Sequence, residues 1–555
     1  MRPFSAQKLP MLALMIVLGL LSSPLGVIPA RAAGVLYVMP GGTGDCSSWA
    51  SACDLQVALS AAASGDEIWV AAGVYKPATD TDRTATFQLK TGVAIYGGFA
   101  GTENIREQRN IVANETILSG DLLGNDGPDF ANNEENSYHV LTGANGATLD
   151  GFTVTSGNAN GNSPHDSGGG LYNTSSSPTL ANIIFTDNAA LFGGGISNDY
   201  SNPTLTYVRF WDNFAEIKGG GMYNTQYSRP TLTYVFFEGN SARVESGGGV
   251  YNSGGSLTLT NVIFTNNTAS QGGGLFNEGS YIEGDDRVIL TSVEFWGNTA
   301  RDGGGGMFNH GNNRLTLTNV TFASNIAKDG RGGGMLNDEG IPTLINVTFA
   351  GNIANGDGSS AGEGGGMFNY ESAPVLINVV FSGNVATRAG GGIRNIFDCL
   401  NCVNSPNADS LTLSNVILWN NSAPDGPEIS NDSSTPIISY SIVQGSGGSA
   451  SWDVELGTDN GNNLDADPLL GPLGDYGGFT YTIPLLAGSS AIDTGNNSVC
   501  PATDQRGVTR PQGAGCDIGA YEAIPLDTQI DSHPADPSNS RTVMFTFSSA
   551  DASAS

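Results

Sequence analysis

The chain has very little positive charge. Its 555 residues contain only 22 Lys and Arg and four His, against 53 Asp and Glu, so the formal net charge is -31 at pH 7. Nucleic-acid binding needs a basic surface that neutralises phosphates. We therefore expect no nucleic-acid partner. The acidic balance favours solubility, and it would also attract Ca²⁺.

Long hydrophobic runs are also missing after the first residues. The apolar run from Met11 to Leu21 follows Arg2 and Lys8 and precedes Ala30-Arg31-Ala32, which is the layout of a secretory signal. A membrane helix needs about 20 apolar residues, more than this run offers. The sequence predicts a signal peptide over residues 1–32, a secreted or cell-surface mature protein, and no membrane-spanning segment in it.

Cysteine is scarce, and its six copies fall into local pairs. In an exported chain such pairs are typical of disulfides that close loops. The three predicted disulfides join Cys46 to Cys53, Cys399 to Cys402, and Cys500 to Cys516. The Cys399-Leu-Asn-Cys402 spacing also suits a redox motif or half of a zinc site, but no second pair lies near it.

Glycine is abundant, with 78 copies, and it recurs in a fixed pattern. A Gly-Gly-Gly-apolar-X-Asn segment is followed by a strand that ends in Phe-X-X-Asn, with Leu418 in place of the last Phe. A repeat of this length indicates a solenoid. The nine triplets begin at Gly168, Gly193, Gly219, Gly247, Gly272, Gly304, Gly332, Gly364 and Gly390.

The pattern inside one repeat predicts short strands separated by turns. Leu315 and Leu317 alternate with Thr, and Val320 and Phe322 begin a new alternation after Asn319. Such a shift of phase indicates a bend at the Asn, a residue that tolerates the left-handed conformation. Helical periodicity is absent from the repeats, so each strand must pair with its counterpart in the next unit. We expect an all-β parallel solenoid with three short strands per coil and roughly twelve coils.

The repeats predict two buried apolar columns: the residue after each Gly triplet, from Leu171 to Ile393, and the Val or Ile with Phe of the following strand, from Ile183 and Phe185 to Val379 and Phe381. Two columns of Asn accompany them. Stacked Asn side chains can hydrogen-bond from coil to coil, so we interpret both columns as structural. The column before the Val contains Asn182, Asn261, Asn319, Asn346, Asn378 and Asn415. The closing column contains Asn188, Asn213, Asn240, Asn267, Asn298, Asn325, Asn352 and Asn384.

The ends of the solenoid must be covered, because open coils expose unpaired strand edges. An amphipathic helix from Asp54 to Ala62 is suited to the N-terminal end, within a cap and first coils over residues 33–135. Repeats fill residues 136–445, and residues 446–524 are expected to cover the C-terminal end. Residues 525–555 are expected to be a linker and an alternating strand around Val543 to Phe547 that lacks a partner.

These features resemble a known family. The triplet and Phe-X-X-Asn segments resemble the repeats of polymorphic outer membrane proteins and of bacterial right-handed parallel β-helix proteins with the pectin-lyase-like fold, from Ala33 to Gly445. Residues 463–522 look like the choice-of-anchor Q segment that closes such proteins, and the tail after Asp527 looks like the start of a bacterial Ig-like domain. The resemblance implies a right-handed parallel β-helix.

The resemblance also implies what a catalytic version would need. Polysaccharide lyases of this fold gather carboxylates around Ca²⁺ and use Arg or Lys as a base, and related hydrolases use three Asp. Asp187 and Asp212 occupy one column in consecutive coils, with Arg209 on the same outer face, but Gly239 and Asn266 follow them. We therefore assign no catalytic residue and take the two Asp as a hypothetical Ca²⁺ pair, with ordinary turn acids as the alternative.

An aromatic column follows the inward apolar residue of the triplet segment. Alternation points these side chains out of the coil, where an exposed ladder could stack on sugar rings. Alternatively, they pack on one another or under the insertions at residues 226–230 and 278–287. The predicted ligand-binding residues are Tyr172, Tyr223, Tyr251, Phe276, Phe308 and Phe368.

The leading hypothesis is a noncatalytic, adhesin-like surface protein. It would be a monomer that binds a polysaccharide or a neighbouring cell surface and needs no cofactor other than Ca²⁺ at the Asp pair. The alternative is a polysaccharide lyase or glycoside hydrolase that acts on acidic glycans. His139 and His165 lack partners at motif spacing and are expected at the surface. Arg506, Arg510, Asp504 and Asp517 are expected to form an ion-pair network inside the C-terminal segment.

Overall fold

The computed structural model describes residues 33–279, 287–311, 314–356, 362–398, 411–525, 528–532 and 546–549. The predicted signal peptide and the Cys399–Cys402 pair lie outside the described residues. The other two predicted disulfides, Cys46–Cys53 and Cys500–Cys516, are formed.

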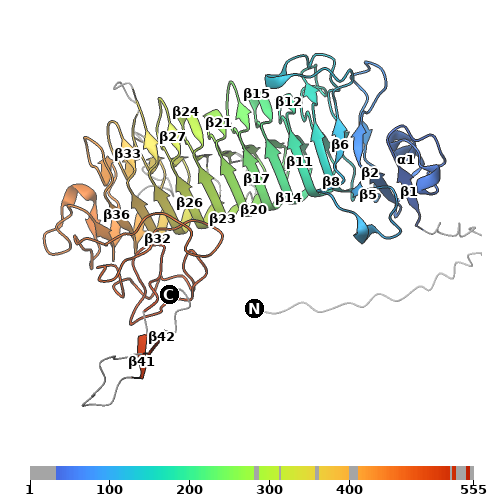
Figure 1. Ribbon diagram of the computed structural model, residues 1–555. Coiled ribbons are helices and arrows are strands. Elements are labelled where there is room, and N and C mark those ends of the chain that lie inside the picture. The colour runs from blue at the N-terminus through green and yellow to red at the C-terminus, as the bar shows by residue number, and fades with distance from the viewer. Residues whose placement is uncertain are drawn as a thin grey trace, which may run out of the picture.

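The protein is a rod of stacked coils, and three parallel sheets run along it (Figure 1). Each strand pairs in parallel with its counterpart in the next coil; Val320, for example, lies beside Val347, and Phe322 beside Phe349. This is the predicted all-β, right-handed parallel β-helix. None of the helices in the described ranges has the length and apolar character that crossing a membrane requires.

Sheet A is the largest, and it carries the longer strands that bend in the middle. Its 19 strands in the described residues are β1 Val35–Val38, β2 Glu67–Ala71, β3 Gly73–Tyr75, β5 Ala94–Phe99, β6 Thr116–Ser119, β8 Thr148–Thr155, β11 Thr179–Thr186, β14 Thr204–Trp211, β17 Thr231–Glu238, β20 Leu257–Thr265, β23 Arg287–Trp296, β26 Arg314–Ala323, β29 Thr343–Ala350, β32 Val375–Ser382, β35 Thr412–Ser414, β36 Ile417–Trp419, β38 Ile437–Ser439, β39 Ile442–Val443 and β40 Thr458–Asp459.

Sheet B follows the Gly triplets and has 12 strands in the described residues, in agreement with the predicted number of coils. They are β4 Phe87–Gln88, β7 Leu141–Thr142, β10 Leu171–Thr174, β13 Ile196–Asp199, β16 Met222–Thr225, β19 Val250–Ser253, β22 Leu275–Glu278, β25 Met307–His310, β28 Met335–Asp338, β31 Met367–Tyr370, β34 Ile393–Ile396 and β37 Ile429–Asp432.

Sheet C consists of the short strands between sheet A and the triplets. Its nine strands in the described residues are β9 Asn158–Ala159, β12 Ala189–Phe192, β15 Phe214–Lys218, β18 Ser241–Ala242, β21 Thr268–Gln271, β24 Thr299–Gly303, β27 Ile326–Ala327, β30 Ile353–Ala354 and β33 Val385–Ala386.

The core is the predicted pair of apolar columns. Leu317, Val320 and Phe322 are fully buried, and Asn319 sits at the bend with φ of 57°. The Phe rings of successive coils stack nearly parallel from Phe185 to Phe381, with centroids 4.6 to 5.2 Å apart. The sequence thus placed both the buried side chains and the bend correctly.

The closing Asn column is a continuous ladder of hydrogen bonds. Each Asn donates its backbone N–H and its Nδ2 to the Oδ1 of the Asn in the next coil. Asn298, for example, donates two hydrogen bonds of 3.0 Å to Asn325. The last Asn of the column, Asn421, donates both groups to the carboxylate of Glu428. The donor groups of this Asn ladder therefore all point toward the C-terminal end of the rod, where the Glu428 carboxylate accepts the last two hydrogen bonds.

The other Asn columns differ from the prediction. In the bend column, coil-to-coil bonds occur between Asn346 and Asn319 and between Asn415 and Asn378. A further buried ladder, which the sequence did not predict, is made by the Asn of the triplet motif, and its Nδ2 groups donate to the Oδ1 of the next coil at 2.8 to 2.9 Å.

The Gly triplets are required where sheet C turns into sheet B. Gly304 has φ of +64°, a conformation that favours glycine. A Cβ on Gly305 would lie 2.3 Å from the carbonyl oxygen of Gly333 in the next coil, and one on Gly306 would lie 2.9 Å from the Phe322 ring. The corner is thus too tight for any side chain.

The N-terminal end is closed by the predicted helix, α1 (Leu55–Ala61). The side chain of Asp54 caps it by accepting a hydrogen bond from the Gln56 N–H. The helix lies at the N-terminal end of the rod (Figure 1). Its residues Leu55, Ala58 and Leu59 are buried in the core. The remaining short helices are the 3-10 turns η1 (Trp49–Ser51), η2 (Arg106–Gln108), η3 (Pro128–Phe130) and η4 (Val454–Leu456).

The C-terminal segment does not act only as an end cover. Trp452 and Leu456 do pack against the end of the core. From about residue 466 onward, however, the chain folds back along the outer face of sheet A (Figure 1). Ile518 packs there in one cluster with Val380 and Ile417. Small and apolar side chains on that face gain burial from the segment, which explains the fold-back.

The predicted ion-pair network inside this segment is present in part, with Glu522 in place of Asp517 as the acid beside Arg510. Arg506 pairs with Asp504 at 2.7 Å, and Arg510 lies 3.4 Å from Glu522. Burial, together with the neighbouring Glu522 charge, raises the pKa of Asp517 to about 6, while hydrogen bonds from backbone N–H groups and the Arg510 charge oppose that rise. The network holds the segment together rather than forming a site.

The expectation of an unpaired strand near the C-terminus is wrong. Two antiparallel strands are present there, β41 (Thr528–Ser532) and β42 (Thr546–Ser549). The partner lies upstream, in the stretch that the sequence assigned to a linker.

Candidate functional site

One part of sheet A is not covered by the other residues that the structure describes, and we call it the open face. It consists of the outward side chains of β11, β14 and β17. In one outward column, Ile184 and Phe236 are exposed, whereas Thr321 and Thr348 are fully buried under the C-terminal segment. The covered region therefore begins a few coils along the rod and leaves the earlier coils open.

The open face carries a group of exposed aromatic rings. Tyr207 is 58% exposed and Tyr234 is 36% exposed, and their rings stack with centroids 5.1 Å apart and planes 9° apart. Trp211 and Phe236, on the same two strands, are 43% and 40% exposed. Phe479 of the C-terminal segment meets the edge of the Tyr234 ring at 6.2 Å. The open face is thus an aromatic surface that the C-terminal segment touches at Tyr234.

The two tyrosines occupy strained backbone positions. Tyr207 and Tyr234 stand in the bend column with φ of 55° and 54°, where six coils have Asn. A bulky residue is unfavourable in the left-handed region, at a cost of the order of 1–2 kcal/mol. Strain of this kind is often found at functional positions. Their presence at a site where Asn would fit better points to a role outside packing.

Charged groups border the aromatic rings. Arg209 forms an ion pair with Glu238 and lies over the Trp211 ring at 4.8 Å. Partial burial raises the pKa of Asp212, and the charges of Asp187 and Glu238 add to this effect, which Arg209 opposes. The two predicted Asp therefore do interact. Among the described residues, neither Asp belongs to a group of three possible metal-ligating side chains within 4.8 Å of one another.

The aromatic column that the sequence predicted as exposed is mostly buried, so that expectation is wrong for four of its six members. Tyr251, Phe276, Phe308 and Phe368 are at most 7% exposed and form one apolar cluster with Leu336. Tyr172 and Tyr223 are half-buried.

The cause is the corner that the Gly triplets create. The side chains do point out of the coil, but the tight turn brings the end of sheet C against them. Lys218 lies over the Tyr251 ring at 4.6 Å, and Arg331 over the Phe368 ring at 4.9 Å. The alternation of residues along a strand predicts which side chains point out of the coil. It does not predict whether a neighbouring strand covers those side chains.

The corner ends in a buried ion-pair network. Glu363 is fully buried, and its carboxylate lies 2.7 Å from Arg388, 3.0 Å from Arg331 and 3.5 Å from Arg394. Because these cations are paired with an internal acid, the network holds adjacent coils together rather than offering a free base.

His139 and His165, expected alone at the surface, lie in contact. His139 is buried, with its Nε2 3.3 Å from Nδ1 of His165 and its Nδ1 3.1 Å from the Gly168 carbonyl oxygen. Burial lowers the pKa of His139 to about 4. Its ring stacks on Tyr172 at 5.0 Å, so it begins the packed aromatic column. The buried His139 ring therefore serves packing.

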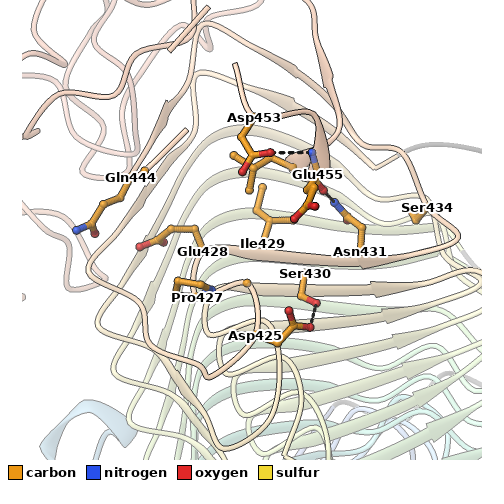
Figure 2. A pocket seen from close by; sticks show the side chains of 13 residues that line it. Asp425, Pro427, Glu428, Ile429, Ser430, Asn431, Ser434, Gln444, Asp453 and Glu455 are labelled. Atoms are coloured by element: carbon orange, nitrogen blue, oxygen red, sulfur yellow. Dashed lines mark hydrogen bonds between the residues drawn. The ribbon is translucent and has the colours of Figure 1, made fainter. Parts of the chain in front are cut away.

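A cavity of about 560 Å³ at the C-terminal end of the rod contains several acids (Figure 2). Glu428 accepts hydrogen bonds from Asn421, and Asp425 accepts one from Ser430 at 2.9 Å. Asp453 caps η4 by accepting from the Glu455 N–H. Burial raises the pKa of Glu428 to about 7, against the lowering effect of its hydrogen bonds. These acids have structural partners, so the open face is the better candidate site.

Sequence reasoning missed the open face, although a signal was available. Tyr207 and Tyr234 stand at the bend, where six other coils have Asn. The bend explains the Asn, so a Tyr at this position is a departure that could have indicated a function. Which part of sheet A stays uncovered could not be inferred, because it depends on where the C-terminal segment docks.

No protein-family model matches the chain, and no curated protein matches its sequence. Among solved structures, pectate lyase Pel9A is 14% identical with a TM-score of 0.32, and the alignment covers 88% of this chain and 96% of the lyase. A family 28 exopolygalacturonase from Yersinia enterocolitica is 11% identical with a TM-score of 0.33, over 74% of this chain and 79% of the enzyme. The β-helix follows from the strand pairing described above.

Proposed function

We propose that this protein is an exported, noncatalytic β-helix that binds a glycan on the open face. The observation that carries the proposal is the stacked, exposed and strained pair Tyr207 and Tyr234. Sugar rings have apolar faces that stack on aromatic side chains, and tyrosine adds a polar hydroxyl at the ring edge. Coils separated by about 4.8 Å repeat such rings along the rod.

The charges favour a neutral glycan. Asp187, Asp212 and Glu238 border the rings, and the only cation on β14, Arg209, is paired with Glu238. An acidic polysaccharide would meet this surface and a chain of net charge -31 with repulsion. Binding should therefore be weak, tolerant of sugar identity and insensitive to salt. The same pairing removes Arg209 as a free base, which argues against a lyase mechanism.

An exported location fits the chemistry of the chain. Cys46–Cys53 and Cys500–Cys516 are formed as disulfides, and disulfides persist in oxidising compartments outside the cytosol. Together with the predicted signal peptide, they support a secreted or cell-surface protein with an adhesin-like role.

The test replaces each tyrosine by the residue that the repeat prefers at that position. Tyr207→Asn together with Tyr234→Asn should abolish retention on neutral polysaccharides while leaving the melting temperature unchanged or higher, because Asn relieves the backbone strain. Affinity electrophoresis in gels that contain each polysaccharide measures retention. The matched control is Tyr200→Asn with Tyr227→Asn, which removes another exposed tyrosine pair, with centroids 6.2 Å apart, and should keep binding.

Two results would contradict the proposal. Unchanged retention by the Tyr207 and Tyr234 variant would remove the open face as the glycan site. Unsaturated products or new reducing ends from polygalacturonate or alginate would favour the enzyme alternative. The second assay uses the wild-type protein with and without Ca²⁺.

A further inference from the structure

The loop between β6 and β7 brings three carboxylates together away from the open face. One oxygen atom from each of Asp121, Asp126 and Glu135 lies within 4.8 Å of the others. No Lys or Arg of the described residues forms an ion pair with any of the three. Two basic groups lie near this loop: Lys76 donates to the Leu122 carbonyl oxygen, and Arg83 donates to the carbonyl oxygen of Asn136 while its charge also interacts with that of Glu135.

A second observation concerns orphaned oxygen atoms around this cluster. Oδ1 of Asp126 and Oε1 of Glu135 are buried and lack a hydrogen-bond partner. Asn136, which is 1% exposed, donates its Nδ2 to Asp126 at 2.9 Å, and its own Oδ1 is buried without a partner. This hydrogen bond places the side-chain amide group of Asn136 against the carboxylate of Asp126. The Oγ of Ser137, fully buried, lacks a partner as well.

Buried oxygen atoms without partners are costly, and three neighbouring carboxylates without a cation add repulsion. One ligand removes both costs, namely a hard cation that prefers carboxylate and amide oxygens. Ca²⁺ takes six to eight such ligands in flexible geometry, and water completes the set where protein oxygens run out. We propose that Asp121, Asp126 and Glu135, with Oδ1 of Asn136, form a Ca²⁺ site.

The site would fix a loop over the first strands of sheet C. Between Asp126 and Glu135, η3 carries Phe130, whose ring lies 5.7 Å from Phe214 on β15. The loop and strands β9, β12 and β15 enclose a cavity of about 420 Å³. Bound Ca²⁺ would hold both ends of this loop, so its removal should loosen the loop without affecting the rod.

The experiment compares two double variants of the full chain by calorimetric titration with Ca²⁺ after chelator treatment. The wild type and Asp187→Asn with Asp212→Asn should each bind one Ca²⁺, and Asp126→Asn with Glu135→Gln should bind none. In chelator, the Asp126 and Glu135 variant should melt at or above the wild-type temperature, because repulsion is relieved. In Ca²⁺ the order should reverse.

Limited proteolysis gives a readout that needs no variant. Cleavage of the wild-type chain within residues 121–136 should be faster in chelator than in Ca²⁺, at equal Mg²⁺. Absence of Ca²⁺ binding by the wild type would overturn the proposal, because water would then satisfy the orphaned oxygens. Equal binding by the Asp126 and Glu135 variant, or loss of binding only in the Asp187 and Asp212 variant, would also overturn it.

Discussion

Replacing Glu428 by Gln tests how the long Asn ladder ends. Glu428 is 3% exposed, and its two oxygens accept hydrogen bonds from the backbone N–H and the Nδ2 of Asn421, at 3.1 and 2.5 Å. It replaces the third Gly of the triplet in the last coil. Burial raises its pKa from 4.5 to about 7, so the folded protein holds this proton more tightly than the unfolded chain does.

The sign of the pH dependence follows from that shift. A carboxyl group whose folded pKa is raised contributes its full stability below the unfolded pKa and loses it as the pH rises through the folded value. The window here is pH 4.5 to 7, and the loss is about 3 kcal/mol. Gln cannot ionise, but its amide nitrogen cannot accept the second bond from Asn421, at a cost of about 1 kcal/mol. Glu428→Gln should therefore destabilise at pH 4 and stabilise at pH 8.

Amide hydrogen exchange in β36 and β37 is the suitable assay, because coils of a solenoid unfold locally. The difference in opening free energy between the wild type and Glu428→Gln should change sign between pH 4 and 8. Glu455→Gln, an exposed acid in the same cavity, is the control and should show no change of sign. If the difference in opening free energy between the wild type and Glu428→Gln did not change with pH, the Glu428 carboxyl group would keep one protonation state from pH 4 to 8. That result would contradict the prediction.

Two further predictions concern packing. Phe322→Ala should lower the free energy of unfolding by about 5 kcal/mol, because it opens a cavity in a fully buried ring stack with neighbours at 4.7 Å on both sides. Chemical denaturation measures this free energy. A loss below about 2 kcal/mol would contradict the stacking role. Gln505→Leu should detach the C-terminal segment, because Gln505 joins Thr348, Thr321 and Thr480 through buried hydrogen bonds. Faster amide hydrogen exchange confined to residues 466–525 would confirm that Gln505 holds the segment on sheet A, and unchanged exchange would contradict it.

The repeats made most of the fold predictable. Asn319, Val320 and Phe322 report the bend and the buried face because every coil must place equivalent residues on the same column. The N-terminal helix was predictable from its own cap and apolar spacing. These features depend on residues that are close in sequence or repeat at a constant interval.

The docking of the C-terminal segment and the packing at the corner were not predictable, because both depend on contacts that neither a short sequence separation nor the repeat interval reveals. Thr321 and Thr348 are ordinary strand residues, and they are buried by contacts with the C-terminal segment, which is far away in the sequence and includes Gln505 and Tyr481. Tyr251 alternates correctly but meets Lys218 across a turn whose angle the pattern does not reveal. The candidate site depends on what is left uncovered, which is a property of the whole molecule.

The ladders also have an evolutionary consequence. Each Asn needs only an identical Asn one coil away, so a whole coil can be gained or lost by in-frame duplication or deletion without leaving any hydrogen bond unmade. Repeats of different length keep the same spacing in the ladder: the Asn337–Asn369 bond, across a 32-residue repeat, and the Asn173–Asn198 bond, across a 25-residue repeat, are both 2.9 Å long. Rod length and surface loops can therefore change independently, and relatives of this protein should differ in coil number before they differ in cross-section.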